Sequence, residues 1–227
     1  MMGMKTIQDK VLEGRQFRRN DAHPELKAVE ETEEKRVFGH ACTFNEPYML
    51  YRSKRGDVEI WEQVDPAAFD KCDMSDVIMQ FDHSGRVLAR TRNGTLKLTP
   101  DSTGLAVEAD LTKSALGPGV YEDIRNGILD RMSFGFTVRA DKREETMDEV
   151  GNIKLVRTIT DVGKLYDVSV VSIPANDGTD ISARSYCDGV IAELEAERLE
   201  VQKRERRKKA LRLKLELIEG EIEHENY

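Results

Sequence analysis

Three residues of this sequence have side chains that together could carry out nucleophilic catalysis: a serine, a histidine and an aspartate. Ser133 lies in ILDRMSFGF, a run that is otherwise typical of a protein interior. If this run is a strand, side-chain alternation directs Met132 and Phe134 to one face and Ser133 to the other. Gly135, the next residue on the face of Ser133, leaves room for another backbone to approach. The pattern fits a nucleophile facing a bound peptide, and it also fits an ordinary serine on the outer face of a strand.

A serine nucleophile requires a general base, and histidine is the usual one because its pKa lies near neutrality. The sequence has four histidines. His23 lies in a polar N-terminal stretch and His224 in a charged C-terminal stretch, so neither is expected to be held rigidly. His40 lies inside an expected strand, which favours a structural role. His83 follows the strand VIMQF and enters a Ser-Gly turn, which makes it the best-placed base.

The third group in such a site is a carboxylate that orients the imidazole. Asp167 lies in the middle of the expected strand LYDVSVV, where a carboxylate without a partner is costly. It could equally be an acid on the outer face of the strand. Asp82 is a rival, but a residue adjacent to His83 usually points away from it. The sequence alone does not establish that these residues lie close together.

The elements expected to position these residues are short strands separated by turns, from residue 36 to about residue 183. Two short helices are expected as well: Asp65–Phe69, where an N-cap aspartate precedes a proline, and GPGVYEDIRNG, which stops at a glycine. A charged hairpin is expected through Asp148–Asn152. The sequence therefore predicts a mostly β fold of the α+β class. The expected strands are VFGHACTF, VEIWEQV, DVIMQF, RVLART, TLKLT, LAVEADL, MSFGFTVRA, IKLVRTITDV and LYDVSVVSIP.

Changes in composition divide the chain into three parts. Residues 1–34 are expected to be a polar, flexible lead-in with one strand around Arg15–Arg19, and residues 35–187 the β-rich domain. Residues 188–227 carry acidic, basic and again acidic blocks, and are expected to form a helical tail. This tail is either a solvated helix or an element that docks to a partner, because so charged a helix gains stability mainly from a partner.

The overall composition disfavours several classes of function. Hydrophobic residues make up 39% and charged residues 34%, with a net charge of −8, which disfavours non-specific binding to nucleic acid. No apolar run approaches the length that spans a bilayer, and the start lacks the pattern of a signal peptide, so we expect no membrane and a cytoplasmic location. Cys42, Cys72 and Cys187 are widely separated and are expected to be packing residues. Because neither CxxC nor HExxH occurs, no metal and no cofactor is expected.

Five motifs resemble those of a known family, in the same order along the chain. They are VFGHACTFN, EIWEQVDPAAF, QFDHS, GILDRMSFGF and LYDVSVVSIPAN. Together they resemble the prohead serine proteases of tailed bacteriophages, the maturation proteases of the HK97 type, which are related in fold to the herpesvirus assemblins. The resemblance implies an assemblin-like β-barrel with Ser133 as nucleophile, His83 as general base and Asp167 as the third member. The chain departs from the family in having Pro66-Ala67 for Pro-Gly, and in Asp167, where many relatives have glutamate.

The resemblance also implies a function. It suggests a serine endopeptidase that cleaves scaffold protein, or the scaffolding segment of a capsid protein, and itself, inside assembling proheads in the host cytoplasm. It makes a homo-oligomer such as a dimer plausible, and a tail that targets the protease to the scaffold and is later removed. Arg139 and the backbone after Ser133 are the candidate oxyanion donors. The alternatives are a non-catalytic assembly or scaffolding protein that retains the fold, and a cytoplasmic hydrolase unrelated to phage assembly.

Overall fold

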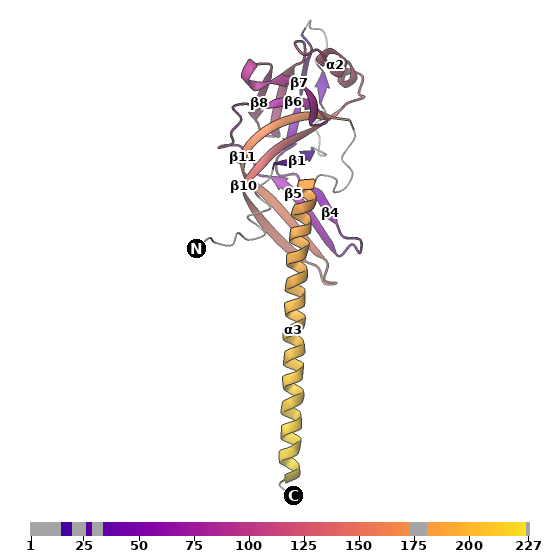
Figure 1. Ribbon diagram of the computed structural model, residues 1–227, viewed down its shortest axis with the longest axis vertical. Helices are drawn as coiled ribbons and strands as arrows, with labels where there is room; N and C mark the ends of the chain where they lie inside the picture. The colour runs from indigo at the N-terminus through magenta and orange to yellow at the C-terminus, as the bar shows by residue number, and fades with distance from the viewer. Residues whose placement is uncertain (1–14, 20–25, 29–33, 173–180, 226–227) are drawn as a thin grey trace. The chain divides into compact units, whose positions relative to one another are not determined.

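The computed structural model describes residues 15–19, 26–28, 34–172 and 181–225 of the chain (Figure 1). The chain divides into two units, residues 1–187 and 188–227, and each is considered by itself. Strands dominate the first unit, and helix α3 runs through the second. The mostly β, α+β fold class expected from the sequence is therefore confirmed.

The larger of two sheets in the first unit contains seven strands. Along one path the order is β1-β10-β11-β5-β4, and β6 pairs with both β11 and β7. Strand β11 is parallel to β5 over its first half and to β6 near its end, while β10 runs antiparallel to it throughout. The strands are β1 (Gln16–Arg19), β4 (Tyr48–Arg52), β5 (Val58–Val64), β6 (Ile78–Phe81), β7 (Ser84–Arg90), β10 (Arg131–Met147) and β11 (Ile153–Val171).

The smaller sheet has four strands in the order β2-β3-β9-β8. They are β2 (Lys27–Ala28), β3 (Arg36–Thr43), β8 (Leu96–Pro100) and β9 (Gly104–Asp110). The β-barrel implied by the resemblance is not what the described strands form, because they make two sheets and no closed barrel. Closure requires the end strands of a sheet to pair with each other, and β1 and β4 at the ends of the larger path do not. Strand β4 is one that the sequence patterns did not predict.

Strand β11 joins two strands that the sequence patterns kept separate, and β10 continues beyond the single strand expected there. The expected charged hairpin joins them. The backbone amide of Asp148 donates to the carbonyl oxygen of Asn152, and its Oδ1 accepts from the amides of Val150 and Asn152. This turn fixes the register in which the rest of β10 and β11 pair, and hence which residues lie opposite each other at the far end of the ladder.

Of the two expected short helices, one is confirmed. Helix α2 spans Gly117–Arg125, with a proline at its first turn, and Gly127 just after it has φ of +70°. At Asp65–Phe69 the helix prediction is wrong. Asp65 does accept a hydrogen bond from the amide of Ala67 at 2.8 Å, but the chain forms successive turns instead. So short a segment does not offset the cost of helix nucleation. A short 3₁₀ helix, η1 (Thr91–Asn93), completes the unit.

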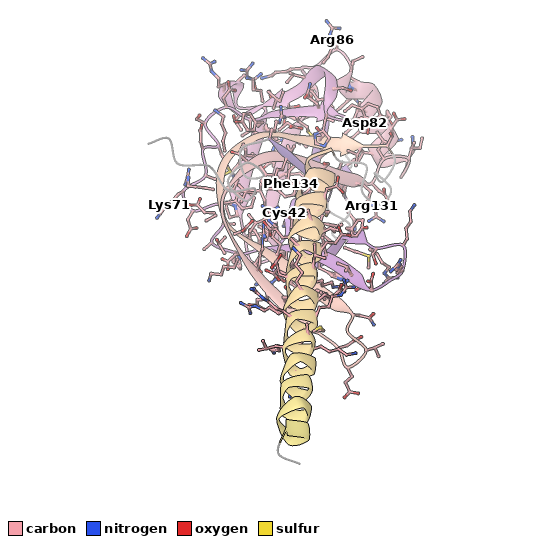
Figure 2. All side chains as sticks on the ribbon, turned by 60° about the horizontal axis from the view of Figure 1, so that its bottom comes forward. Cys42, Lys71, Asp82, Arg86, Arg131 and Phe134 are labelled. Atoms are coloured by element: carbon pink, nitrogen blue, oxygen red, sulfur yellow. The ribbon has the colours of Figure 1, made fainter. Side chains whose placement is uncertain are left out.

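One hydrophobic core contains side chains of both sheets. Phe134 and Phe136 of β10 stack in it with their ring centroids 4.5 Å apart. Figure 2 shows Phe134 and Cys42 within the body of the domain and Lys71 and Arg86 at its periphery. Cys42, Cys72 and Cys187 are free thiols, and burial raises the pKa of Cys42 to about 12. Such a thiol is a poor nucleophile, which supports the expected packing role.

Helix α3 spans Ile181–Glu225. Its exposed side chains form ion pairs one turn apart, such as Lys203 with Glu200 at 2.7 Å and Lys208 with Glu205 at 2.9 Å. Each pair adds a few tenths of a kcal/mol at most. No described helix is long and apolar enough to cross a membrane.

Candidate active site

Ser133, His83 and Asp167 lie in contact, with the imidazole between the other two side chains. The Nε2 atom of His83 lies 2.5 Å from Oγ of Ser133, and its Nδ1 atom lies 2.5 Å from Oδ2 of Asp167. The structure thus brings together three residues that the sequence could not place relative to one another.

The serine and the aspartate come from the paired strands β10 and β11. In their register Ser133 lies opposite Ser169, and Gly135 lies opposite Asp167. Asp167 is therefore on the neighbouring strand, two residues before Ser169, which is the residue opposite Ser133. Because both strands are long and are buried where they carry these residues, they hold the two side chains at a fixed separation.

The histidine comes from the two-residue turn between β6 and β7. Asp82 and His83 both have left-handed backbone conformations, with φ of +47° and +53°. These values are those of a hairpin turn whose twist matches its strands, and they cost energy for residues other than glycine. Asp82 offsets the cost, because its carboxylate accepts from the amide and hydroxyl of Ser172 at 2.9 and 2.7 Å. Asp82, the other candidate for orienting the imidazole, therefore holds the turn at the end of β11 instead.

The carboxylate of Asp167 is fully buried and has three polar partners. Besides His83, it accepts from the Ser169 hydroxyl at 2.8 Å and from the guanidinium of Arg15. Burial by itself would raise the pKa of Asp167, but the hydrogen bond and charge of His83 outweigh this effect, with help from Ser169 and Arg15. The resulting pKa lies below the ordinary aspartate value, so the carboxylate is ionised at neutral pH. An ionised Asp167 can hold the Nδ1–H tautomer of the imidazole.

Ser133 is 5% exposed, so the open face expected from strand alternation is covered. On the edge of β10 away from β11 lies strand β1, and the Ser133 hydroxyl lies 2.9 Å from the carbonyl oxygen of Arg18. Alternation correctly separates Ser133 from Met132 and Phe134, but it carries no information about which segments contact the Ser133 side chain.

The arrangement can remove a proton from the serine hydroxyl. The Nε2 atom of a neutral imidazole accepts that proton, and the carboxylate on the Nδ1 side stabilises the imidazolium that forms. Comparison with known families decides which reaction class this chemistry belongs to. The model of the caudovirus prohead serine proteases matches residues 23–189. The chain belongs to this family. Comparisons with curated proteins and with solved structures gave no match.

In this member of the family the remaining residues singled out in the sequence have other positions. His40 contacts Oδ2 of Asp101 through its Nε2 at 2.8 Å, in keeping with a structural role. Arg139 donates to Asp161 at 2.9 Å, so the structure does not bring it to Ser133. His23 and the side chain of His224 lie outside the described residues. Among the residues that the structure describes, no cluster of histidine, cysteine or acidic side chains could hold a metal ion.

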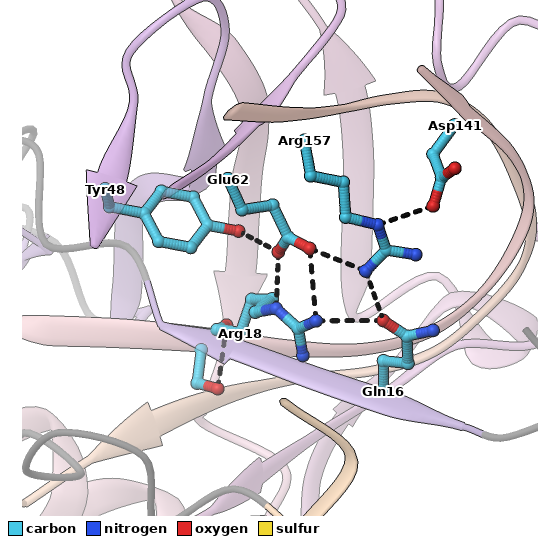
Figure 3. Close-up of polar contacts among 7 residues, drawn as sticks. Gln16, Arg18, Tyr48, Glu62, Asp141 and Arg157 are labelled. Carbon is cyan, nitrogen blue, oxygen red and sulfur yellow. Dashed lines mark hydrogen bonds and ion pairs between the residues drawn. The ribbon is translucent and has the colours of Figure 1, made fainter. Parts of the chain in front are cut away.

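Several polar residues near the candidate site were missed in the sequence. Ser169 could have been found, since alternation in LYDVSVV places it on the same face as Asp167. Arg15 gave no signal, because its contact with Asp167 joins residues 152 positions apart. A buried network centred on Glu62 also gave none, since its members come from separate strands (Figure 3). Long-range contacts of this kind depend on sheet order, which the local pattern does not contain.

Proposed function

We propose that this chain is a serine endopeptidase that cleaves scaffold protein, or the scaffolding segment of a capsid protein, and itself during prohead maturation. Ser133 is the nucleophile, His83 the general base and Asp167 the residue that orients the base. One observation carries the proposal: in a chain of the prohead serine protease family, the imidazole of His83 lies 2.5 Å from both Ser133 Oγ and Asp167 Oδ2.

The reaction proceeds by acyl transfer. His83 takes the proton of Ser133 as Oγ attacks a peptide carbonyl carbon, and then gives it to the leaving amine. Water, deprotonated in turn by His83, hydrolyses the ester and restores the serine. Each positioned proton transfer contributes roughly 10²- to 10⁴-fold to the rate. Asp167 keeps its charge throughout and stabilises the imidazolium.

The family supports the setting of this activity. A prohead protease acts in assembling capsids, so capsid or scaffold protein is the proposed substrate and the interior of the prohead in the host cytoplasm the proposed location. A homo-oligomer, an assemblin-like arrangement of the strands, and a division into a lead-in, a protease domain of residues 35–187 and a tail of residues 188–227 belong to the same proposal. We further propose that this tail targets the protease to the scaffold. Deleting it is expected to reduce incorporation into proheads, and unchanged incorporation would count against this role.

The decisive experiment compares the wild-type chain with Ser133→Ala, each co-produced with the capsid protein of the phage. A fluorophosphonate probe, which reacts with activated serines, is expected to label the wild type and not the variant, and intact-mass spectrometry is expected to show cleavage with the wild type alone. Ser102→Ala is the matched control, since Ser102 lies exposed in the turn between β8 and β9. If wild type and Ser133→Ala both lack labelling and cleavage, the chain is a non-catalytic assembly protein instead.

A further inference from the structure

Strand β1 occupies the position of a peptide laid against the nucleophile strand. It has four residues, lies at the end of the sheet path and runs antiparallel to β10, with Arg18 opposite Phe134 and Arg19 opposite Ser133. The Ser133 hydroxyl lies 2.9 Å from the carbonyl oxygen of Arg18. The peptide group between Arg18 and Arg19 is therefore the one that β1 presents to the serine. Addition of an extended peptide to a sheet edge is a common mode of peptide recognition.

The two side chains of β1 that the structure describes are polar, and both are buried. Gln16 is 1% exposed and Arg18 is 3% exposed. A strand that serves only to complete a core usually buries apolar side chains, because burying a polar group is costly unless partners are provided. Besides the bond between Arg18 and Gln16 themselves, partners come from Glu62 and Arg157 on strands far from β1 in the sequence, as expected of a binding pocket.

The pocket that holds Arg18 has a carboxylate at its end (Figure 3). Glu62 of β5 accepts from Nε of Arg18 and from its Nη2 at 3.1 Å, a two-bond contact that matches the planar guanidinium. Glu62 is itself held by the hydroxyl of Tyr48 at 2.6 Å and by Nη1 of Arg157 at 2.7 Å. The ring of Phe136 forms a side of the pocket, 5.8 Å from the guanidinium carbon of Arg18.

The charges of the pocket favour a cation at this place. Arg157 also donates to Asp141 at 2.6 Å, so its single positive charge is shared between two carboxylates. Arg18 provides Glu62 with a second cation in direct contact. Burial alone would raise the pKa of Glu62, but Arg18 and Arg157 outweigh that effect and hold it below the ordinary value. A buried charge needs a partner, so the occupant of this pocket is a positively charged side chain.

Strand β1 also lies outside the part of the chain that defines the family. The family match begins at residue 23, after β1, and continues to residue 189, whereas Glu62, Tyr48 and Arg157 all lie within it. The pocket thus belongs to the protease domain, and the strand that fills it is an extension of that domain.

We propose that β1 is a substrate segment bound in cis, that the Glu62 pocket selects arginine as the residue whose carbonyl is attacked, and that the bond cut is Arg18–Arg19. This inference rests on the proposed protease function and adds to it the residue that the cleavage site requires. Ser133 Oγ forms an ester with the Arg18 carbonyl carbon, and the C–N bond to Arg19 breaks. His83 passes the serine proton to the amine of Arg19. Water then releases residues 1–18 with a carboxylate on Arg18. Segments of other proteins that place arginine in this pocket are cut in the same way.

The first test is the mass of the full chain after expression. The wild type is expected to begin at Arg19, and Ser133→Ala is expected to retain residues 1–18. Arg18→Ala is expected to slow the cut by about 30-fold or more, as is Glu62→Gln, because each leaves a buried charge without its partner. The matched control is Glu59→Gln, which removes a half-exposed carboxylate from the same strand and is expected to leave the cut unchanged. Equal rates in Arg18→Ala and the wild type would overturn the proposal.

A second test separates loss of recognition from loss of folding. The wild-type protein, as it is purified, is given the synthetic peptide EGRQFRRNDAHP, which copies residues 13–24, and its counterparts with alanine or glutamate in place of Arg18. We expect cleavage after the first arginine of the Arg-Arg pair, about 30-fold or more slower with alanine, and none with glutamate. If a fluorophosphonate labels Ser133 but the chain stays intact or all three peptides are cut alike, this inference fails and the protease function stands. If Ser133 is not labelled and nothing is cut, the function itself fails.

Discussion

His83 and Asp167 lie 84 positions apart in the sequence, and Nδ1 of the one is 2.5 Å from Oδ2 of the other. The contact depends on one strand pairing of β11 and on one hydrogen bond at its end. Strand β6 runs parallel to β11, with Ile78 opposite Asp167 and Phe81 opposite Val170. The turn after Phe81 then carries His83 back over the strand. Asp82 accepts a hydrogen bond from Ser172 at the end of β11, so the strand and the turn both hold the imidazole in place.

Replacing His83 by asparagine is expected to lower the rate of substrate cleavage by about 10³-fold or more, because the serine loses its general base. Asparagine is chosen because it tolerates a left-handed backbone conformation. His40→Asn is the matched control, since His40 pairs with Asp101 at the other sheet and is expected to leave the rate unchanged. Initial rates on the capsid substrate measure both. A His83→Asn enzyme with more than a tenth of the wild-type rate would contradict the assignment.

Ser169 is expected to position Asp167. Its buried hydroxyl donates to Oδ2 of Asp167 at 2.8 Å, the oxygen that also contacts His83. The Ser169→Ala change removes a hydrogen bond to this carboxylate, and we expect the loss to cost about 1.5 to 3 kcal/mol of stability. The pKa of Asp167 is expected to rise, because that hydrogen bond lowers it. We expect kcat to fall about tenfold with little change in KM, and its acid limb to move to higher pH.

The control for this change is Thr158→Val, which removes a hydroxyl from the same strand where it accepts from Gln63. It is expected to affect stability alone. Equal losses of kcat in both variants would show that Ser169 acts merely through the packing of β11. Full kinetic profiles between pH 5 and pH 9, with denaturant unfolding of each variant, provide the measurement.

The depressed pKa of Asp167 makes part of the folding stability depend on pH. A carboxylate whose pKa is lower in the folded than in the unfolded state stabilises the protein above its unfolded pKa, about 3.9. That contribution is lost as pH falls through the lower folded value. Asp167→Asn has no charge to protonate. The difference in unfolding free energy between wild type and Asp167→Asn is therefore expected to shrink between pH 5 and pH 3.

Urea unfolding of the two proteins at pH 7, 5, 4 and 3 tests this expectation. Changes that protonation of other carboxylates causes are common to both proteins and cancel in the difference. A difference that stays constant over this range would mean that folding does not lower the pKa of Asp167, and one that grows toward low pH would mean that folding raises it.

The elements of the fold could be predicted where the local pattern decides them. In β5 the buried side chains alternate from Val58 to Val64, which is the period that the sequence shows. Helix α2 carries its own start and stop signals. At Asp65 the same kind of signal failed, since a cap and a proline describe the beginning of a helix but not whether enough residues follow. The barrel prediction failed for a different reason, because the pairing of end strands is not encoded in any one strand.

The candidate site divides in the same way. Ser133, His83 and Asp167 could each be selected by residue type and place within a strand or turn. Their contact could not, since it depends on the β10–β11 register and on β6 joining the end of β11. Alternation in β5 places Glu62 on the buried face with Ile60 and Val64, but it does not identify the residues that pair with this carboxylate. They are Arg18 and Arg157, which lie 44 and 95 positions away.

Two glycines of α2 provide a test of the packing that supports this domain. A Cβ atom on Gly117 would lie 1.9 Å from the carbonyl oxygen of Leu111, whereas one on Gly119 would meet nothing within 4 Å. Gly117→Ala must therefore displace the helix start or the backbone at Leu111, and we expect a loss of about 3 kcal/mol. Gly119→Ala is expected to stabilise the protein by up to about 1 kcal/mol, since alanine is the better helix former. The two changes are chemically identical and lie in the first turn of the same helix. Opposite signs of the change in unfolding free energy, measured with denaturant, would therefore separate the effect of the close contact between Gly117 and Leu111 from the effect of helix propensity.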